Sequence, residues 1–232
     1  MTAIKSYIDD FLHLLFPHIC LGCNSDVLNA EDELCVACLS NLPETGFLFT
    51  YANPVERIFY GRLSVEKAGS AFYFNKDSVI QNVIIQLKYR SNQKAGIFLG
   101  KLLGQRILNC ARFDDVDLII PLPLNDKKLN KRGYNQSQVI ARGVASVWHK
   151  PVVTSAVERI FFTETQTHKD RIARWQTMEG VFIVTQPSLL ENKHVLLVDD
   201  VLTTGATFEA CGAAILKVPG VKLSLVTVAY TF

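Results

Sequence analysis

The chain has 232 residues, of which 49% are hydrophobic, and this is enough to bury the core of one large domain, or of one domain with a small module. Its 24 basic and 22 acidic side chains give a net charge of only +2, so the composition does not imply a general polyanion-binding surface. No apolar run approaches the roughly 18 residues that cross a bilayer. We therefore expect no membrane insertion, and a cytoplasmic protein with reduced thiols.

The first predicted element is a helix within MTAIKSYIDDFLHLLFPHIC. Asp9, Asp10 and His13 interrupt its apolar residues and no small-residue cleavage site follows, so the segment does not have the pattern of a signal peptide. The apolar residues recur at helical spacing and predict an amphipathic helix that ends at Pro17. Because basic residues are nearly absent from it, we expect this helix to pack on its own protein and not on a membrane surface.

Four cysteines follow as two CxxC pairs, Cys20 with Cys23 and Cys35 with Cys38. This spacing places four thiolates where they can close a tetrahedron around Zn²⁺, and the metal would supply stability that so short a segment lacks. Four thiolates leave no open position, so we expect a structural site. The alternatives are a redox pair or buried free thiols, but a redox CxxC usually opens a helix after a strand. The two remaining cysteines, Cys110 and Cys211, are expected within helical stretches as small buried hydrophobic residues.

Strands and helices alternate along the rest of the chain. After a connector over 44–70 with strand-like alternation near its end, apolar spacing predicts helices at 78–90, 95–108, 135–148 and 207–218. Short apolar runs predict strands at 116–124, 194–200 and, with alternating polarity, 221–232, whereas 151–160 fits either structure. This order predicts an α/β fold with a largely parallel sheet flanked by helices. We expect an N-terminal helix and cysteine module over 1–43 and an α/β domain over 44–232.

The strand predicted at 194–200 ends in two acids, Asp199 and Asp200, and the sequence TTGAT follows over 203–207. In an open α/β sheet, ligands bind at the carboxyl ends of the strands. The TTGAT segment supplies N–H groups and hydroxyls at the start of a helix, where a phosphate is favoured, and Gly205 permits a backbone shape closed to other residues. A ligand with a phosphate about one sugar's length from a diol would satisfy both halves. The carboxylates would accept from the hydroxyls or help to hold a hydrated Mg²⁺.

Three alternatives to this interpretation were considered. The acidic strand of a P-loop NTPase requires GxxxxGK[ST], and a dinucleotide-binding fold requires GxGxxG, and the chain contains neither motif. The two acids could also serve only to cap the following helix. The loop that directly follows them favours a ligand site over a simple cap.

These motifs resemble a known family. The run VLLVDDVLTTGAT resembles the phosphoribosyl-pyrophosphate (PRPP) signature of type I phosphoribosyltransferases. With the four-cysteine module, LKYR, PLPLNDKKLNKRGYNQSQ, TQTHKDRIARW and GVF, it occurs in the order seen in the ComF family, which includes competence protein ComF and the GntX-like proteins. The resemblance spans nearly the whole chain. It implies a type I phosphoribosyltransferase-like core, with a mainly parallel sheet flanked by helices, behind a zinc-ribbon-like module.

The resemblance also implies roles for individual residues. Asp199 and Asp200 would hold the ribose hydroxyls, the stretch from Thr203 to Thr207 would wrap the 5-phosphate, and Thr165 to Arg174 would match a mobile loop. The chain departs from the family pattern at Thr177, where Asn is usual, and at Asp170, where a small polar residue is usual. Loop closure and acceptor choice are the properties that these two differences would affect. The catalytic residues would be Asp199, Asp200, Arg171 and Arg174. The residues expected to bind PRPP are Asp199, Asp200, Val201, Leu202, Thr203, Thr204, Gly205, Ala206, Thr207, Pro121, Leu122, Pro123, Leu124, Lys88, Arg90, Lys131 and Arg132.

Basic residues lie in three clusters that could neutralise a pyrophosphate leaving group together with Mg²⁺. They are Lys88 with Arg90, the group Lys127, Lys128, Lys131 and Arg132, and Arg171 with Arg174. Each cluster alone fits a solvated surface, but their places beside predicted strand ends or loops favour anion contact. The run KRGYNQSQ, with Tyr134, suits base stacking, a single-stranded nucleic acid, or a helix N-cap at Asn135 or Ser137. We assign no role to His149 or His168.

Two functions of different classes follow. The first is a Mg²⁺-dependent phosphoribosyltransferase that moves the 5-phosphoribosyl group from PRPP to an acceptor. The second is a non-catalytic PRPP- or nucleotide-binding accessory protein in DNA uptake, with single-stranded DNA or DNA-uptake proteins as partners. A structural zinc protein with an inactive site is disfavoured, because the chain retains both Asp199 and Asp200 and the TTGAT segment over 203–207. A homodimer is compatible with either function.

Overall fold

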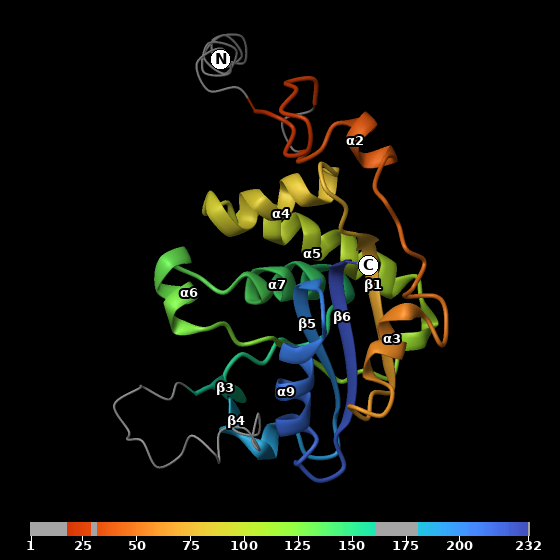
Figure 1. Ribbon diagram of the computed structural model, residues 1–232, viewed down its shortest axis with the longest axis vertical. Helices are drawn as coiled ribbons and strands as arrows, with labels where there is room; N and C mark the ends of the chain where they lie inside the picture. Colours follow the sequence, from red (N-terminus) through yellow and green to blue (C-terminus); the bar gives the residue numbers. More distant parts are fainter. Residues whose placement is uncertain (1–17, 29–31, 161–180, 232) are drawn as a thin grey trace, which may run out of the picture.

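The computed structural model describes residues 18–28, 32–160 and 181–231 (Figure 1). The helix predicted to end at Pro17 and the loop from Thr165 to Arg174 lie outside these residues. The same holds for the predicted catalytic residues Arg171 and Arg174, and for His168, Asp170 and Thr177.

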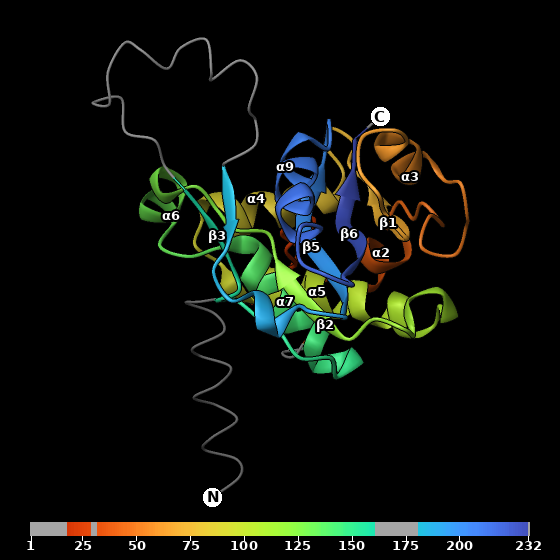
Figure 2. The ribbon, with the colours of Figure 1, turned by 90° about the horizontal axis from the view of Figure 1, so that it is seen from below.

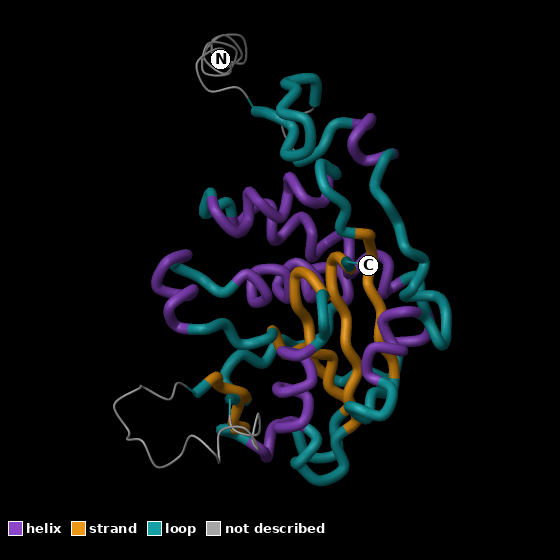
Figure 3. The backbone as a smooth tube through the Cα atoms, in the orientation of Figure 1, coloured by secondary structure: helices purple, strands orange, loops and turns teal. Residues whose placement is uncertain are grey.

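The centre of the protein is a four-stranded sheet in which all neighbouring strands are parallel. Its order across the sheet is β1 (Lys67–Tyr73), β6 (Lys222–Tyr230), β5 (His194–Leu202) and β2 (Leu118–Pro121). In the described part of the chain, β3 (Val157–Arg159) and β4 (Phe182–Val184) form a second, antiparallel sheet. Figure 3 shows the central strands enclosed by helices.

Helices cover both faces of the sheet (Figures 1 and 2). One apolar layer joins α4 (Val79–Tyr89), α5 (Gln93–Leu108) and α7 (Gln136–Trp148) to the sheet. The opposite layer contains α3 (Pro54–Phe59), α9 (Ala206–Ile215) and the β3–β4 pair. Strand β5 supplies both layers because successive side chains point to opposite faces: Leu196 and Val198 join the first, and Val195 and Leu197 join the second. The expected fold class, a parallel α/β core behind a four-cysteine segment, is confirmed.

Shorter elements connect this framework. They are α2 (Val36–Ser40), α6 (Asp126–Arg132) and the 3₁₀ turns η1 (Ala111–Phe113) and η2 (Pro187–Leu189). Among the described residues, no helix has the length and apolar character needed to cross a membrane.

Three local expectations are corrected. The basic segment after β2 is not only a loop, because α6 forms within it, with Asn125 as its N-cap and Gly133 in the left-handed region at its end. Strand β6 is buried on both faces instead of alternating, because one apolar layer covers each face of the sheet. The isolated cysteines are buried as expected, but Cys110 follows α5 instead of lying in a helix, and its thiol donates to the Leu48 carbonyl at 2.9 Å.

Helices α5 and α7 pack closely because glycines face each other where they cross. A Cβ atom on Gly143 would overlap the Ile97 carbonyl oxygen and approach the Gly100 Cα at 2.8 Å. A Cβ on Gly104 would stand 2.9 Å from the Val144 carbonyl oxygen. Glycine therefore sets the separation of these two helices.

The four-cysteine segment packs against α4. Cys20, Leu21 and Cys38 belong to the same apolar cluster as the α4–α5–α7 layer. The Asn82 side-chain amide donates to the Gly22 carbonyl at 2.7 Å, which ties α4 to the first CxxC turn. The segment therefore shares the hydrophobic core of the α/β domain.

Candidate functional site

The sheet opens a crevice at the carboxyl ends of β2 and β5. The chain leaves β2 toward α7 on one face, and leaves β5 toward α9 on the other. Neighbouring parallel strands whose connections diverge in this way leave a space between them, which is where α/β proteins bind ligands. The loop after β2 and the acids of β5 meet at this point.

The two acids at this edge have different partners. Asp200 is buried and pairs with Lys88, whose Nζ lies 2.9 Å from the Asp200 Oδ2. Lys88 comes from the last turn of α4. Asp199 accepts a hydrogen bond of 2.6 Å from the Ser137 hydroxyl, in the first turn of α7. Helices of one layer thus hold both carboxylates that β5 presents.

Burial raises the pKa of Asp199, and the neighbouring Asp200 charge raises it further, to about 7. The Ser137 hydrogen bond and the Lys88 charge act in the opposite direction. Two adjacent carboxylates in a partly buried site are costly, and perturbed groups of this kind often mark functional sites.

The phosphate loop, defined as Thr203 to Thr207, connects β5 to α9. Gly205 is the N-cap of α9 and has φ +78°, a conformation that L side chains rarely adopt. Thr203, Thr204 and Thr207 are exposed. The first N–H groups of α9 have no partner within the helix and are available to an anion at this end.

A cavity joins the acid pair to the N-terminus of α9 and to the loop after β2. Its cationic residues are Lys88, Lys128, Arg132 and Arg159. The full lining is Lys88, Leu122, Pro123, Leu124, Lys128, Arg132, Gln136, Ser137, Arg159, Asp199, Asp200 and Thr207. Four cations facing two carboxylates leave an excess of positive charge, which suits a polyanionic ligand.

The structure places eight of the seventeen residues predicted to bind PRPP in the lining of this cavity, whereas Val201 to Ala206 do not line it. Lys88, Arg132, the acids, Thr207 and the stretch Leu122 to Leu124 line the cavity. Arg90 and Lys131 are exposed and do not line it, and Pro121 lines the neighbouring cavity.

Sequence reasoning missed Gln136, Arg159 and the contact of Ser137 with Asp199. Gln136 is buried and accepts from Arg132 Nη1 at 2.7 Å, which directs that guanidinium. Ser137 was considered only as a helix cap. Arg159 ends a strand whose sequence fitted either structure, so no local pattern marked it.

The run KRGYNQSQ serves mainly to build the site. Asn135 is the N-cap of α7 and accepts from the Ser137 N–H at 3.0 Å, while its own amide donates to the Leu122 carbonyl at 3.0 Å. The Tyr134 hydroxyl donates to the Leu87 carbonyl, and burial raises its pKa. The N-cap interpretation is therefore confirmed for Asn135, and Tyr134 is held by a structural contact.

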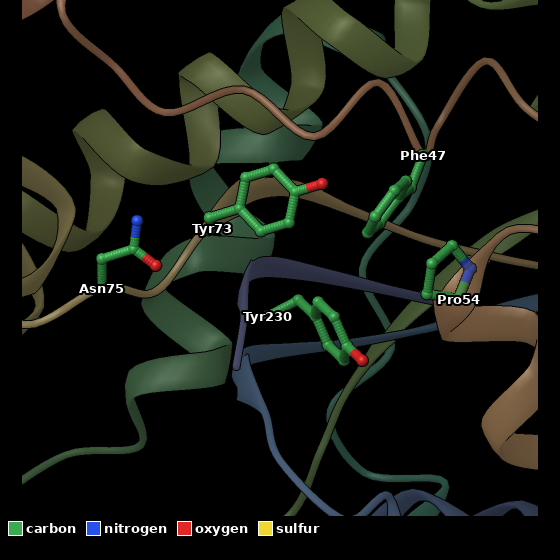
Figure 4. A pocket seen from close by; sticks show the side chains of 5 residues that line it. All are labelled: Phe47, Pro54, Tyr73, Asn75 and Tyr230. Atoms are coloured by element: carbon green, nitrogen blue, oxygen red, sulfur yellow. The ribbon is translucent and has the colours of Figure 1, made fainter. Parts of the chain in front are cut away.

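Two further cavities lie along this edge. One shares Pro123, Leu124 and Arg159 with the acid-pair cavity and extends between α6 and β3, past Gln138 and Glu158. The other lies beyond β6 and is lined by Phe47, Pro54, Tyr73, Asn75 and Tyr230 (Figure 4). Tyr73 and Tyr230 are register partners that end β1 and β6, and the Phe47 ring packs edge-on against both, so this second cavity is mainly aromatic.

The four-cysteine cluster is compact. Its sulfur atoms all lie within 4.8 Å of one another, and Cys23 Sγ and Cys35 Sγ are 3.8 Å apart. Tetrahedral Zn–S bonds of about 2.3 Å require sulfur separations of about 3.8 Å. The Cys20 sulfur also accepts the N–H groups of Gly22 at 3.4 Å and Cys35 at 3.3 Å, as a thiolate would.

The charges of this cluster also fit a cation. Burial acts to raise the pKa of Cys20, but N–H bonds from Cys35, Cys23 and Gly22 outweigh it and lower the pKa to about 6. Burial and contact with the other thiols raise the pKa of Cys38 far above its ordinary value. Four sulfurs at these separations cannot all ionise without a cation between them, so the donor set suits a metal such as zinc.

Curated proteins with similar sequences are named for DNA utilization or competence. DNA utilization protein YhgH of Escherichia coli K12 is 28% identical over 138 residues, which cover 58% of this chain and 60% of that protein. Competence protein F of Haemophilus influenzae is 25% identical over 199 residues, covering 81% and 86%, and competence protein ComFC of Bacillus subtilis is 25% identical over 100 residues, covering 43% and 38%. The chain is thus similar to proteins named for competence and DNA utilization, which supports the resemblance to the ComF family.

The chain spans about 60% of the length of the YhgH relatives that it matches. No protein-family profile matches it. Solved structures that resemble it include the allosteric regulatory enzyme of purine biosynthesis, with 19% identity, a TM-score of 0.41, and coverage of 57% of this chain and 25% of that one. Adenine phosphoribosyltransferase from Leishmania tarentolae has 11% identity, a TM-score of 0.38 and coverage of 82% and 94%.

Proposed function

We propose that this chain is a ComF-like phosphoribosyltransferase that uses PRPP and Mg²⁺. The observation that carries the proposal is the acid pair, Asp199 and Asp200, in one cavity with the N-terminus of α9 and four cationic side chains. PRPP has a diol, a 5-phosphate and a pyrophosphate, and the cavity offers a group of matching chemistry for each.

Each part of PRPP has a proposed partner. The carboxylates of Asp199 and Asp200 accept hydrogen bonds from the ribose 2- and 3-hydroxyls, and the phosphate loop binds the 5-phosphate through its N–H groups. Lys88, Arg132 and the loop after β2 face the pyrophosphate. Lys88 would then exchange its contact with Asp200 for one with the ligand, since the hydroxyls take over that carboxylate.

The reaction needs no nucleophile from the protein. The bond from C1 to the pyrophosphate oxygen breaks, the acceptor forms a new bond to C1, and C1 has oxocarbenium character between these events. The cationic side chains stabilise the charge that develops on pyrophosphate, and the cavity orients the ribose. Mg²⁺ bound with PRPP would supply further neutralisation. The cavity between α6 and β3 adjoins this site and is the proposed entry for the acceptor.

Calorimetry with PRPP and Mg²⁺ tests the binding step. The unmutated protein should bind PRPP, and Asp199→Asn combined with Asp200→Asn should weaken binding at least about a hundredfold, since each lost hydrogen bond to a charged group costs about 1.5–3 kcal/mol. Glu191→Gln, an exposed acid before β5, is the matched control and should bind normally. The absence of PRPP binding by the unmutated protein would falsify the proposal.

Turnover is tested separately by a screen for PRPP-dependent pyrophosphate release. The acceptors should include purines, pyrimidines, amines and single-stranded DNA. Release with one acceptor class, lost in the double Asp variant, would establish the transfer reaction and name its substrate class.

The second candidate function is that of an accessory protein in DNA uptake, which binds PRPP or a nucleotide without turnover. The relatives favour it, because they are named as DNA utilization and competence proteins. Its partners would be single-stranded DNA or DNA-uptake proteins. Binding of PRPP with no pyrophosphate release across the whole acceptor panel would select this function over the first.

We also propose that Cys20, Cys23, Cys35 and Cys38 hold one structural Zn²⁺. The separations of the sulfur atoms and the N–H bonds to Cys20 support this. With four thiolate ligands the metal would have no open position for a substrate, so its role would be to stabilise the segment that packs on α4.

A further inference from the structure

Arg62 connects three elements that meet behind the phosphate loop. It follows α3, where its N–H donates to the Phe59 carbonyl at 3.0 Å. Its Nη1 donates to the Ile58 carbonyl at 3.2 Å and to the Thr204 carbonyl at 3.3 Å. Its Nη2 forms an ion pair with Glu209 in the first turn of α9. One guanidinium therefore joins the end of α3, the phosphate loop and the start of α9.

Helix α3 also supports the loop at Gly205. A Cβ atom there would stand 2.9 Å from the Ile58 Cγ2 and 3.0 Å from the Phe59 Cε1, so the loop backbone lies directly on α3. The Phe59 ring packs edge-on against Phe208 of α9, with centroids 6.4 Å apart. Together, α3 and Arg62 form the back wall of the phosphate loop.

The contact to Thr204 has a specific effect on the loop backbone. In a trans peptide the carbonyl and the following N–H point in opposite directions. A guanidinium that binds the Thr204 carbonyl therefore turns the Gly205 N–H to the side of the loop away from Arg62. N–H groups bind a phosphate well only when the backbone holds them in a convergent arrangement before the ligand arrives.

We infer that Arg62 is a positioning residue for phosphate binding, which it serves by holding the Thr204 carbonyl from behind. The inference rests on the proposed function, because it assigns the 5-phosphate of PRPP to this loop. Arginine suits the role, since its planar group donates to two carbonyls and a carboxylate at once, whereas lysine has a single compact ammonium.

The experiment compares Arg62→Gln and Arg62→Lys with the unmutated protein. The Kd values for PRPP with Mg²⁺ and for ribose 5-phosphate are measured by calorimetry, and amide hydrogen exchange is followed at residues 203–207 without ligand. Arg57→Gln is the matched control, because it removes the same charge from an exposed position on α3. Melting temperatures show whether each variant is folded.

Arg62→Gln should raise the Kd for both PRPP and ribose 5-phosphate about tenfold, in line with the loss of one charge-assisted contact. Exchange in the loop should become faster, and the melting temperature should change little because the side chain is partly exposed. Arg62→Lys should recover part of the affinity, and Arg57→Gln should match the unmutated protein.

The outcomes separate this inference from the proposed function. If the unmutated protein binds PRPP and Arg62→Gln binds it equally well, the inference alone is overturned. Equal loss of affinity in Arg57→Gln would also overturn it, because a general charge effect would then suffice. If the unmutated protein binds neither ligand, the proposed function fails, and the inference fails with it.

Discussion

Ser137 donates a 2.6 Å hydrogen bond to Asp199, and this contact links the first turn of α7 to the carboxyl end of β5. The hydroxyl is buried and stabilises the ionised form of a carboxyl group whose pKa burial raises to about 7. Ser137 therefore influences both the direction of the Asp199 carboxylate and the pH at which it ionises.

Removing this hydroxyl should shift the pH dependence of ligand binding. In Ser137→Ala the pKa of Asp199 should rise, because a hydrogen bond to its charged form is lost. PRPP binding at pH 7 should weaken by about fivefold, and the loss should shrink at higher pH. The measurement is the PRPP Kd from pH 6 to pH 9. Ser146→Ala is the control, since that hydroxyl donates to the Gly143 carbonyl on the same helix. A pH profile that matches the unmutated protein would contradict this role.

Asp199→Asn should stabilise the protein while weakening ligand binding. In the unfolded chain Asp199 loses its proton near 3.8, whereas in the folded protein it keeps the proton up to about 7. Between these values the folded state binds more protons, so stability falls as the pH rises. Asparagine does not titrate and avoids this loss. The gain in melting temperature should be largest at pH 8 and should shrink as the pH falls toward 4. A gain that does not depend on pH would contradict the explanation, and Glu191→Gln should show none.

The purified protein should contain one zinc ion per chain. Cys35→Ser should lose the metal and lower the melting temperature, because the proposed metal would stabilise the segment. Cys110→Ser should retain zinc, since Cys110 is buried elsewhere and contacts the Leu48 carbonyl. Elemental analysis and thermal unfolding provide both readouts. Purified protein without zinc, folded as stably as after zinc addition, would refute the assignment.

Gly143→Ala should destabilise the fold without touching the acid pair directly. The new methyl group would collide with the α5 backbone at Ile97 and Gly100, and overpacking of this kind costs about 1–3 kcal/mol. Ser146→Ala, on the exposed side of α7, should change the unfolding free energy by less than about 0.5 kcal/mol. Chemical denaturation measures both. An unchanged midpoint for Gly143→Ala would show that the helices can separate without cost.

The parts of the site that could be predicted from the sequence are those whose residues lie close together in the chain. The acids of β5, the phosphate loop and the two CxxC pairs each form a continuous motif with a recognisable spacing. Ser137 and Arg159 were not recovered as acid-pair or cavity residues, because only folding brings them to β5 from α7 and β3. For the same reason, the sequence does not indicate a role for Arg62. Only the fold brings α3 and Arg62 next to the phosphate loop. Helix α6 was missed because Leu129 is its single apolar residue and none of its residues is buried, so no apolar period marks it.

Helix α4 contacts the cysteine segment at one end and the acid pair at the other. Its first turns pack on the cysteine segment, where Asn82 holds the Gly22 carbonyl, and its last turn carries Lys88 to Asp200. The helix has 11 residues and spans about 16 Å, with no glycine or proline at which it could bend. Helix α4 therefore connects the position of the cysteine segment to that of the cation that neutralises Asp200. We expect changes in the cysteine segment to reach the acid pair through this helix.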